Sequence, residues 1–246
     1  MILWLIIILM GFFICSMTLI KRRLLRWVTS LLVVGSLLVT ICFLIAHMTS
    51  HLGMEVATNT QTQKIYSAAS TKSPVNILVI KRLGTSAKRY VLIYRTHPTA
   101  KAKAHFIPDQ KHVVIAIKKK AWYRRENVQQ ASVKTTTKNW RWRSKMIRFW
   151  FKIGTPETLI SKKSVVIVPT QTWLVLTSGQ TKQLAKIQRR EGSHIVIELK
   201  AQLAQKIAAY QQQHPKTRPE QLKLYMQQQN VILTVQILRQ ILKQSN

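Results

Sequence analysis

The hydrophobic pattern of the chain is dominated by two uncharged runs near its beginning. The first covers residues 1–20 and the second covers residues 27–46. About 20 helical residues, each rising about 1.5 Å, match the roughly 30 Å hydrocarbon core of a bilayer. Buried helices of soluble proteins rarely run this far without a charge. The pattern therefore predicts a hairpin of two transmembrane helices, in which small residues such as Gly35 suit close helix contact.

Two kinds of processing signal resemble such runs. A secretory signal peptide has basic residues before its apolar region and small residues at its cleavage site, and residues 1–20 show neither feature. The second run follows basic residues and ends near Cys42, as a lipoprotein signal does, but the preceding Ile41 is bulkier than the small residue usual there. We therefore expect both runs to be retained.

The turn between the runs, residues 21–26, carries four basic side chains. These topology-determining residues are Lys21, Arg22, Arg23 and Arg26. Short basic loops stay on the cytoplasmic side of a membrane. No Lys or Arg precedes the first run, and the next one after the second run is Lys64. The expected location is the cell membrane, crossed twice, with both termini extracytoplasmic.

The remaining 200 residues change character twice. Residues 47–74, rich in Thr, Ser and Gln, suggest a membrane-proximal connector or an edge segment. Residues 75–177 contain short β-branched and aromatic runs typical of strands, at 75–80, 90–94, 113–117, 164–169 and 173–176. Gly84 between the first two favours a hairpin. A mainly antiparallel β-rich domain is therefore expected.

Residues 178–246 favour helices. The segments 180–190 and 194–213 are rich in Lys, Gln, Ala and Leu, and a last helix is expected from Pro219 to about Lys243. Its apolar stripe comprises Val231, Val235, Leu238 and Leu242. Such a stripe ordinarily packs on a core, and a partner membrane protein is the alternative. The expected fold class is α+β: two transmembrane helices, the β domain, then C-terminal helices.

Basic and aromatic residues interleave most densely at residues 140–153. The candidate contacts with anions or a membrane surface are Trp140, Arg141, Trp142, Arg143, Lys145, Arg148, Trp150 and Lys152. As two strands that meet at Ser144, or as a mixed segment, it would place aromatic rows in the core. As a helix it would lie on an anionic bilayer. Both geometries stay open, and the neighbouring Thr-rich residues favour the strand.

The formal net charge of the chain is +32, and removing the four basic residues of the turn leaves +28 on the outer part. Such a charge favours salt-dependent association with polyanions. Anionic lipid and phosphate-bearing wall polymers are the expected partners outside the membrane, and nucleic acid becomes one only if the topology is inverted. A merely basic, solvated surface is an equally simple interpretation.

Candidate chemistry is sparse. Cys15 and Cys42 lie within the apolar runs, and the seven carboxylates are scattered along the outer part. His47, His51 and Glu55 would align for a metal ion only if a helix continued through Gly53, so we predict no metal and no cofactor. No common nucleotide-binding or hydrolase motif is present. These features make an enzyme the less favoured interpretation.

Several segments together resemble a known family. They are the hairpin with its basic turn, HLGMEVATNTQTQKIYS (51–67), ILVIKRLGTSAKRYVLIYR (77–95) and VPTQTWLVLTSGQTKQL (168–184). The chain resembles uncharacterised two-span membrane proteins of lactic-acid bacteria, domain of unknown function four-eight-one-one. Ile153 and Gly154 replace a Phe-Gly pair of that family. The resemblance implies no activity, and it assigns no functional residues.

The favoured hypothesis is a membrane-anchored, extracytoplasmic module with a non-catalytic role in the cell envelope, which binds anionic polymer or lipid through its Lys and Arg surface. One alternative is an accessory subunit that packs on a partner membrane protein. Another is an envelope hydrolase or transferase without a recognisable motif.

Overall fold

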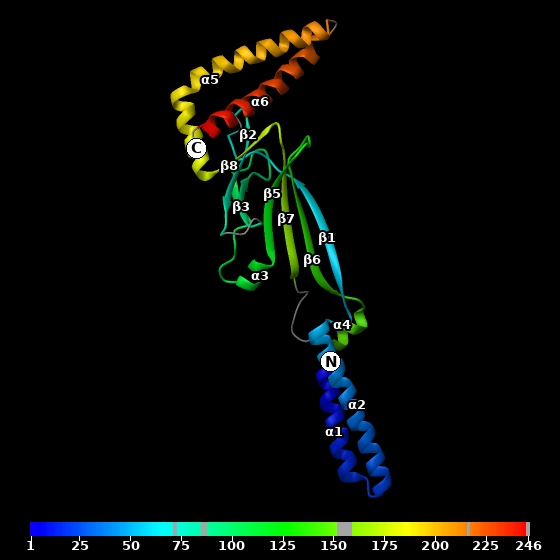
Figure 1. Cartoon of the computed structure of the whole chain (residues 1–246). Helices are drawn as coiled ribbons and strands as arrows, with labels where there is room; N and C mark the ends of the chain where they lie inside the picture. The colour runs from blue at the N-terminus through cyan, green and yellow to red at the C-terminus, as the bar shows by residue number, and fades with distance from the viewer. Residues whose placement is uncertain (71–72, 85–87, 152–158, 216, 245–246) are drawn as a thin grey trace. The chain divides into compact units, whose positions relative to one another are not determined.

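The computed structural model of the chain describes residues 1–70, 73–84, 88–151, 159–215 and 217–244 (Figure 1). It divides into two compact units. Unit 1 consists of Met1–Asn59 and Lys138–Ile160, and unit 2 consists of Thr60–Thr137 and Ser161–Asn246. Three long strands, β1 (Met54–Lys64), β6 (Ser132–Trp142) and β7 (Leu159–Pro169), contribute residues to both units.

Unit 1 begins with the helical pair α1 (Ile2–Leu19) and α2 (Arg23–Ser50). The buried hydroxyl of Ser16 lies 2.7 Å from Thr29 Oγ1 and 3.2 Å from Ser30 Oγ, so small polar side chains join the helices. Most of the other side chains are exposed. Both helices are long and apolar enough to cross a membrane.

The second helix differs in its bounds from the expected span of 27–46. It starts at Arg23 and ends at Ser50, so Arg23 and Arg26 belong to its first turn. The predicted connector 47–74 accordingly contains the end of α2 and the long strand β1, which is an edge strand of its sheet. Alternating Thr and Gln residues fit an exposed edge, because Thr favours strands and the polar side chains face water.

Two four-stranded sheets organise the β region. One has the order β1-β6-β7-β5, and the other has the order β4-β3-β2-β8. The additional strands are β2 (Asn76–Arg82), β3 (Tyr90–Tyr94), β4 (Lys103–His105), β5 (Lys119–Glu126) and β8 (Trp173–Thr177). The predicted antiparallel β2–β3 pair is confirmed. The sheets are mixed, however, because β2 pairs in parallel with β8 and β5 with β7.

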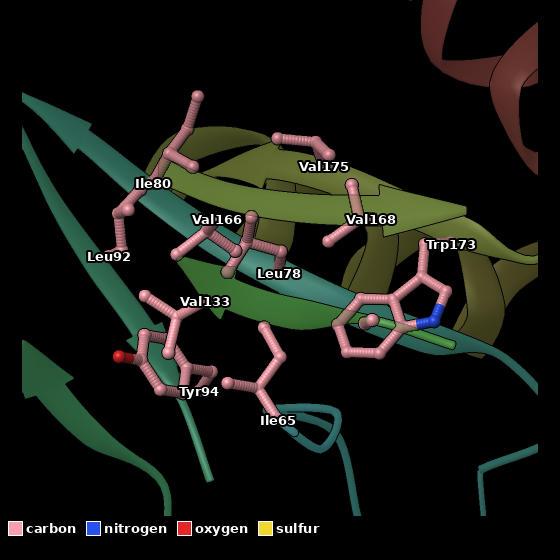
Figure 2. Packing of buried hydrophobic residues seen from close by; sticks show 11 residues of the cluster. Ile65, Leu78, Ile80, Leu92, Tyr94, Val133, Val166, Val168, Trp173 and Val175 are labelled. Carbon is pink, nitrogen blue, oxygen red and sulfur yellow. The ribbon is translucent and has the colours of Figure 1, made fainter. Parts of the chain in front are cut away.

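Both sheets contribute strand residues to unit 2, and the main core of the unit lies between them (Figure 2). Leu78 and Leu92 of one sheet face Val166 and Val168 of the other, and all four are fully buried. Burying a Val or Leu side chain contributes about 1.5–3 kcal/mol. The same environment raises the pKa of the buried Tyr94 phenol to about 12, because burial disfavours its charged form.

A second cluster covers the other face of β8 with helices. Trp173 and Val175 face the main core, whereas Leu174 and Leu176 pack against α5 (Ser178–Gln213) and α6 (Pro219–Gln244). This division follows from the two-residue period of a strand. The predicted stripe of α6 is confirmed as core in its C-terminal half, since Val235, Leu238 and Leu242 are buried there.

Two segments differ from the sequence-based expectation. Residues 113–117, predicted as a strand, form the short helix α3 (Val113–Ile117). Strand β5 follows directly and takes the place next to β7, so residues 113–117 pair with no strand, and β-propensity depends on such pairing. The two predicted helices at 180–213 are one helix, which continues through Gly192. A capping box of Thr177 and Gln180 begins that helix.

Candidate membrane-interface site

Three residues shape the C-terminal end of α2. His51 adopts a left-handed conformation with φ 54°, and Gly53 follows with φ 83°. Nδ1 of His47 lies 2.7 Å from the carbonyl oxygen of Leu52, which lies beyond the last turn. Left-handed residues of this kind commonly end helices, because they redirect the chain away from the helix axis. Strand β1 then starts at Met54.

Two tryptophans of β6 pack on the histidines at this helix end. The rings of His47 and Trp142 stack at 5.2 Å, and those of His51 and Trp140 stack at 4.4 Å. Trp140 and Trp142 lie on one face of the strand because they are two residues apart. The Arg143 N–H also donates to the Gly53 carbonyl at 3.1 Å. We call this arrangement within unit 1 the α2 junction.

Helix α4 (Lys145–Phe151) completes the α2 junction. Ser144 starts it, because its side-chain oxygen accepts from the Ile147 N–H at 3.2 Å. Ile147 lies against Gly53, and the Phe151 ring lies 5.0 Å from the ring of His47. These two residues are four apart and therefore form the inner face of the helix.

The outer face of α4 is apolar and exposed. Met146, Phe149 and Trp150 are 71%, 58% and 39% exposed, respectively. Their spacing of three and four residues places them together on one side of the helix. The rings of Phe149 and Trp150 meet edge to face at 5.9 Å. An apolar face of this kind, left open to solvent, marks a surface that contacts protein or membrane.

Basic side chains are frequent within and just before α4. Arg141, Arg143, Lys145 and Arg148 are all exposed. Within the described residues the ion pairs are His112–Asp109 and Arg124–Glu126, so none of these four cations has a carboxylate partner there. Their charge is therefore free to attract anions from solution or from a surface. Lys152, the remaining predicted cation, lies outside the described residues.

The structure combines the two geometries expected for residues 140–153. The chain is a strand through Trp142 and a helix from Lys145 to Phe151, so Trp140 and Trp142 stack inward while Trp150 faces out. The predicted topology residues lie elsewhere in unit 1, at the α1–α2 turn, where Lys21, Arg22 and Arg23 are exposed and Arg26 is half-buried.

The roles of His47 and His51 in the α2 junction were not predicted. The sequence suggested interfacial residues or, less readily, metal ligands with Glu55, and the helix that would align all three ends at Ser50. No group of three metal-ligating side chains occurs among the described residues. One signal could have revealed the stacking. The two tryptophans are two residues apart, which places them on one face of a strand, and the two histidines are four residues apart, which is the spacing of one helix face.

Comparison with known proteins places the chain in a family. Neither a curated protein nor a solved structure matches it. The family model described as Domain of unknown function (DUF4811) matches residues 22–184. The match covers more than half of the chain and includes α2, both sheets, the α2 junction and the beginning of α5. The protein is therefore a member of the DUF4811 family.

Proposed function

We propose that the protein is a membrane-anchored, extracytoplasmic module that holds an anionic lipid surface through its α2 junction. In this proposal α1 and α2 span the cell membrane, and the basic turn between them is cytoplasmic. The role in the cell envelope is binding or scaffolding rather than catalysis. The observation that carries the proposal is the exposed face of α4, fixed beside the end of α2.

The exposed apolar surface of the two helices supports the anchor. Leu24, Trp27 and Leu31 are 85%, 70% and 74% exposed, although they belong to a helix of 28 residues with few charges. In water this surface would be unfavourable, at about 25 cal/mol per Å² of apolar area. A bilayer removes that cost. The basic residues at the turn then favour its cytoplasmic location.

The position of α4 follows from the anchor. A spanning α2 would bring its last turn, with His47, and the following residue His51 to the membrane surface, and α4 contacts His47 and Gly53 directly. Tryptophan and tyrosine concentrate at this level of a bilayer, and interfacial helices insert an apolar face between basic residues. Each Lys or Arg near an anionic surface contributes about 1 kcal/mol.

Lipid fits the outer face better than a wall polymer. Met146, Phe149 and Trp150 offer apolar area that acyl chains can cover. A hydrophilic, phosphate-bearing polymer would engage only the cations and would leave that area in water. The accessory-subunit alternative gains no similar support, because the α6 stripe that suggested it packs within unit 2.

The test measures whether α4 enters the headgroup region of an anionic bilayer. The full chain, with Cys15 and Cys42 replaced by alanine, carries a single cysteine at Phe149→Cys labelled with an environment-sensitive fluorophore. It is reconstituted into nanodiscs of phosphatidylcholine alone or mixed with phosphatidylglycerol, with spin-labelled lipids as quenchers. We expect strong quenching in the anionic discs, reduced by high salt and by Lys145→Glu with Arg148→Glu.

The matched control places the label at Leu224→Cys, which is exposed on α6 and belongs to unit 2. Its quenching should not respond to the charge reversals on α4. A fluorophore at position 149 that stays in water in both kinds of disc would refute the proposal. Equal quenching in neutral and anionic discs would show that the insertion of α4 does not depend on anionic lipid, and would contradict the electrostatic part of the proposal.

A further inference from the structure

Unit 2 contains a cavity of about 590 Å³ that the membrane-interface site does not use. It lies among the residues before β3, the segment from Phe106 to Ile117, and strands β5 and β7. Pockets that hold small ligands measure about 300–1,000 Å³, and they are mostly apolar with a few polar groups. This cavity has both the size and the composition of a ligand site.

Small side chains form the floor of the cavity. Ala121 of β5 and Ser164 of β7 are partners in the parallel register, and they are 5% and 1% exposed. The Ser164 hydroxyl lies 3.0 Å from Thr135 Oγ1, so it is already engaged on its own sheet. Larger residues at these two positions would fill the space above the sheet. The hollow is therefore a consequence of two specific side chains.

Cations lie directly next to this floor. Lys119 and Lys162 are also register partners, two residues before Ala121 and Ser164. They consequently share the face of the sheet that borders the cavity. Like charges opposite each other on neighbouring strands are destabilising. Arg89 and Lys120 line the same cavity. A bound anion would relieve this repulsion.

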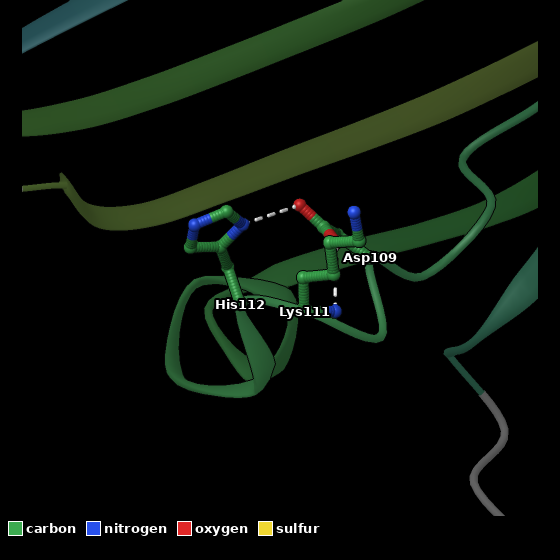
Figure 3. A network of polar contacts seen from close by, with 3 residues as sticks. All are labelled: Asp109, Lys111 and His112. Carbon is green, nitrogen blue, oxygen red and sulfur yellow. Dashed lines mark hydrogen bonds and ion pairs between the residues drawn. The ribbon is translucent and has the colours of Figure 1, made fainter.

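One carboxylate lines the cavity, and other groups engage it. Asp109 Oδ2 lies 2.9 Å from His112 Nδ1, and Oδ1 accepts from the Lys111 N–H at 2.9 Å (Figure 3). Within the described part of the chain, Arg89, Lys119, Lys120 and Lys162 form no ion pair with it or with any other carboxylate. The cavity therefore keeps a net positive charge.

The remaining lining of the cavity includes apolar residues that are exposed. Val113 and Ile117 of α3 line the cavity, as do Phe106 and Ile107. No residue of α3 is buried, and Ile107 is 66% exposed. Phe106 adopts φ 65°, a conformation that costs a non-glycine residue about 1–3 kcal/mol. The backbone thus holds this apolar segment against the cavity at an energetic cost.

We propose that this cavity binds a single-chain lipid with an anionic headgroup, such as a fatty acid or a lysophospholipid. The headgroup contacts Lys119, Lys162 and Arg89, and the acyl chain covers Val113, Ile117 and Phe106. Charge complementarity and the apolar wall select this ligand over a small inorganic anion, which would leave α3 uncovered. The proposal goes beyond the membrane-interface function, because its residues all belong to unit 2.

The test labels the cavity in the full chain. The protein is reconstituted into phosphatidylcholine nanodiscs, which present no anionic surface to α4, and is irradiated with palmitate that carries a mid-chain diazirine. Mass spectrometry of the peptides then locates the adducts. We expect adducts within residues 106–117, in addition to those on α1 and α2. Lys119→Gln with Lys162→Gln should reduce the 106–117 adducts several-fold, whereas Lys134→Gln, an exposed residue outside the cavity, should not.

Two further variants separate loss of the site from loss of the fold. Ala121→Leu should fill the floor and reduce the same adducts, with near-ultraviolet circular dichroism to verify folding. The diazirine alcohol of equal length should label residues 106–117 weakly. Equal labelling by acid and alcohol, or adducts confined to α1 and α2, would overturn the proposal. Complete protection by inorganic phosphate would show a small-anion site instead.

Discussion

At the scale of single residues, Gly53 determines how closely α4 approaches α2. A Cβ at this position would lie 2.5 Å from Ile147 Cγ2, and the φ of 83° already disfavours any other residue. The Ile147 methyl is branched directly from Cβ, so it can move away only by leaving the preferred χ1 rotamer or by shifting the backbone. We predict that Gly53→Ala destabilises the docking of α4 by about 1–3 kcal/mol. Hydrogen exchange of residues 145–151 in the full chain should accelerate accordingly.

Gly35 provides the matched control for this change. It lies within α2, before the helix end, and has no atom within 4 Å of an added Cβ. Gly35→Ala should therefore leave the exchange of residues 145–151 unchanged. If both substitutions accelerate exchange equally, the close contact between Gly53 and Ile147 is not what holds α4.

We predict that His105 makes the stability of unit 2 depend on pH. Burial lowers its pKa from the ordinary 6.5, and Lys103 acts in the same direction against a hydrogen bond with the Tyr94 backbone. As the pH falls through 6.5, the unfolded chain binds the proton first, so the free energy of unfolding decreases. Stability is thus retained above pH 6.5 and lost towards the lowered pKa.

His105→Phe should remove this dependence and keep the ring contact. The His105 ring stacks on Tyr94 at 4.0 Å, and a phenyl ring can occupy the same place. Urea unfolding of the full chain in a neutral detergent, at about pH 7.5 and pH 5.5, measures how much the free energy of unfolding falls with pH in wild type and variant. An equally steep loss in the variant would assign the pH dependence to other groups.

At the scale of elements, the C-terminal half of α6 belongs to the core of unit 2. Leu238 is 3% exposed and packs with Leu174 and Leu176 of β8. Leucine-to-alanine changes in such positions cost about 2–5 kcal/mol. We predict that Leu238→Ala lowers the free energy of unfolding by this amount, as measured by urea unfolding. Leu224→Ala, at a position 68% exposed in the same helix, should change stability by less than about 0.5 kcal/mol.

Helices and strands were predictable where the local sequence pattern of one segment was sufficient to specify them. The long apolar runs, the β2–β3 hairpin around Gly84 and the α6 stripe each carry their own period or turn residue, and the structure contains all three. Residues 113–117 were assigned to a strand because strand propensity says nothing about whether a neighbouring strand is present. The parallel β2–β8 pair joins residues about 100 positions apart, which no local pattern specifies.

The candidate site was predictable in composition and not in geometry. The sequence marks the basic and aromatic residues at 140–153 as candidate surface contacts, but their division between β6 and α4 depends on stacking with His47 and His51. The cavity in unit 2 escaped prediction for a related reason. Ala121 and Ser164 are ordinary small residues in sequence, and only the register between β5 and β7 places them side by side.

At the scale of the whole molecule, the proposed anchor predicts which side of the membrane Thr62 faces. This residue is exposed on β1. With Cys15 and Cys42 replaced by alanine, Thr62→Cys should react with a membrane-impermeant maleimide in intact cells. A cysteine that reacts only after lysis would reverse the topology and would make cytosolic polyanions, nucleic acid included, the relevant partners.

The same proposal makes the basic turn responsible for orientation, since charge near short loops directs insertion. Replacing Lys21, Arg22, Arg23 and Arg26 with glutamine should therefore produce a mixed population in which only part of the Thr62→Cys protein is labelled from outside. The matched control removes four exposed charges from α5, at Lys182, Lys186, Arg189 and Arg190. Positions so distant in sequence from the apolar helices have little influence on insertion, so the control should label fully. If both sets of substitutions lower labelling equally, the total charge of the chain determines its orientation, and the position of the basic residues in the turn does not.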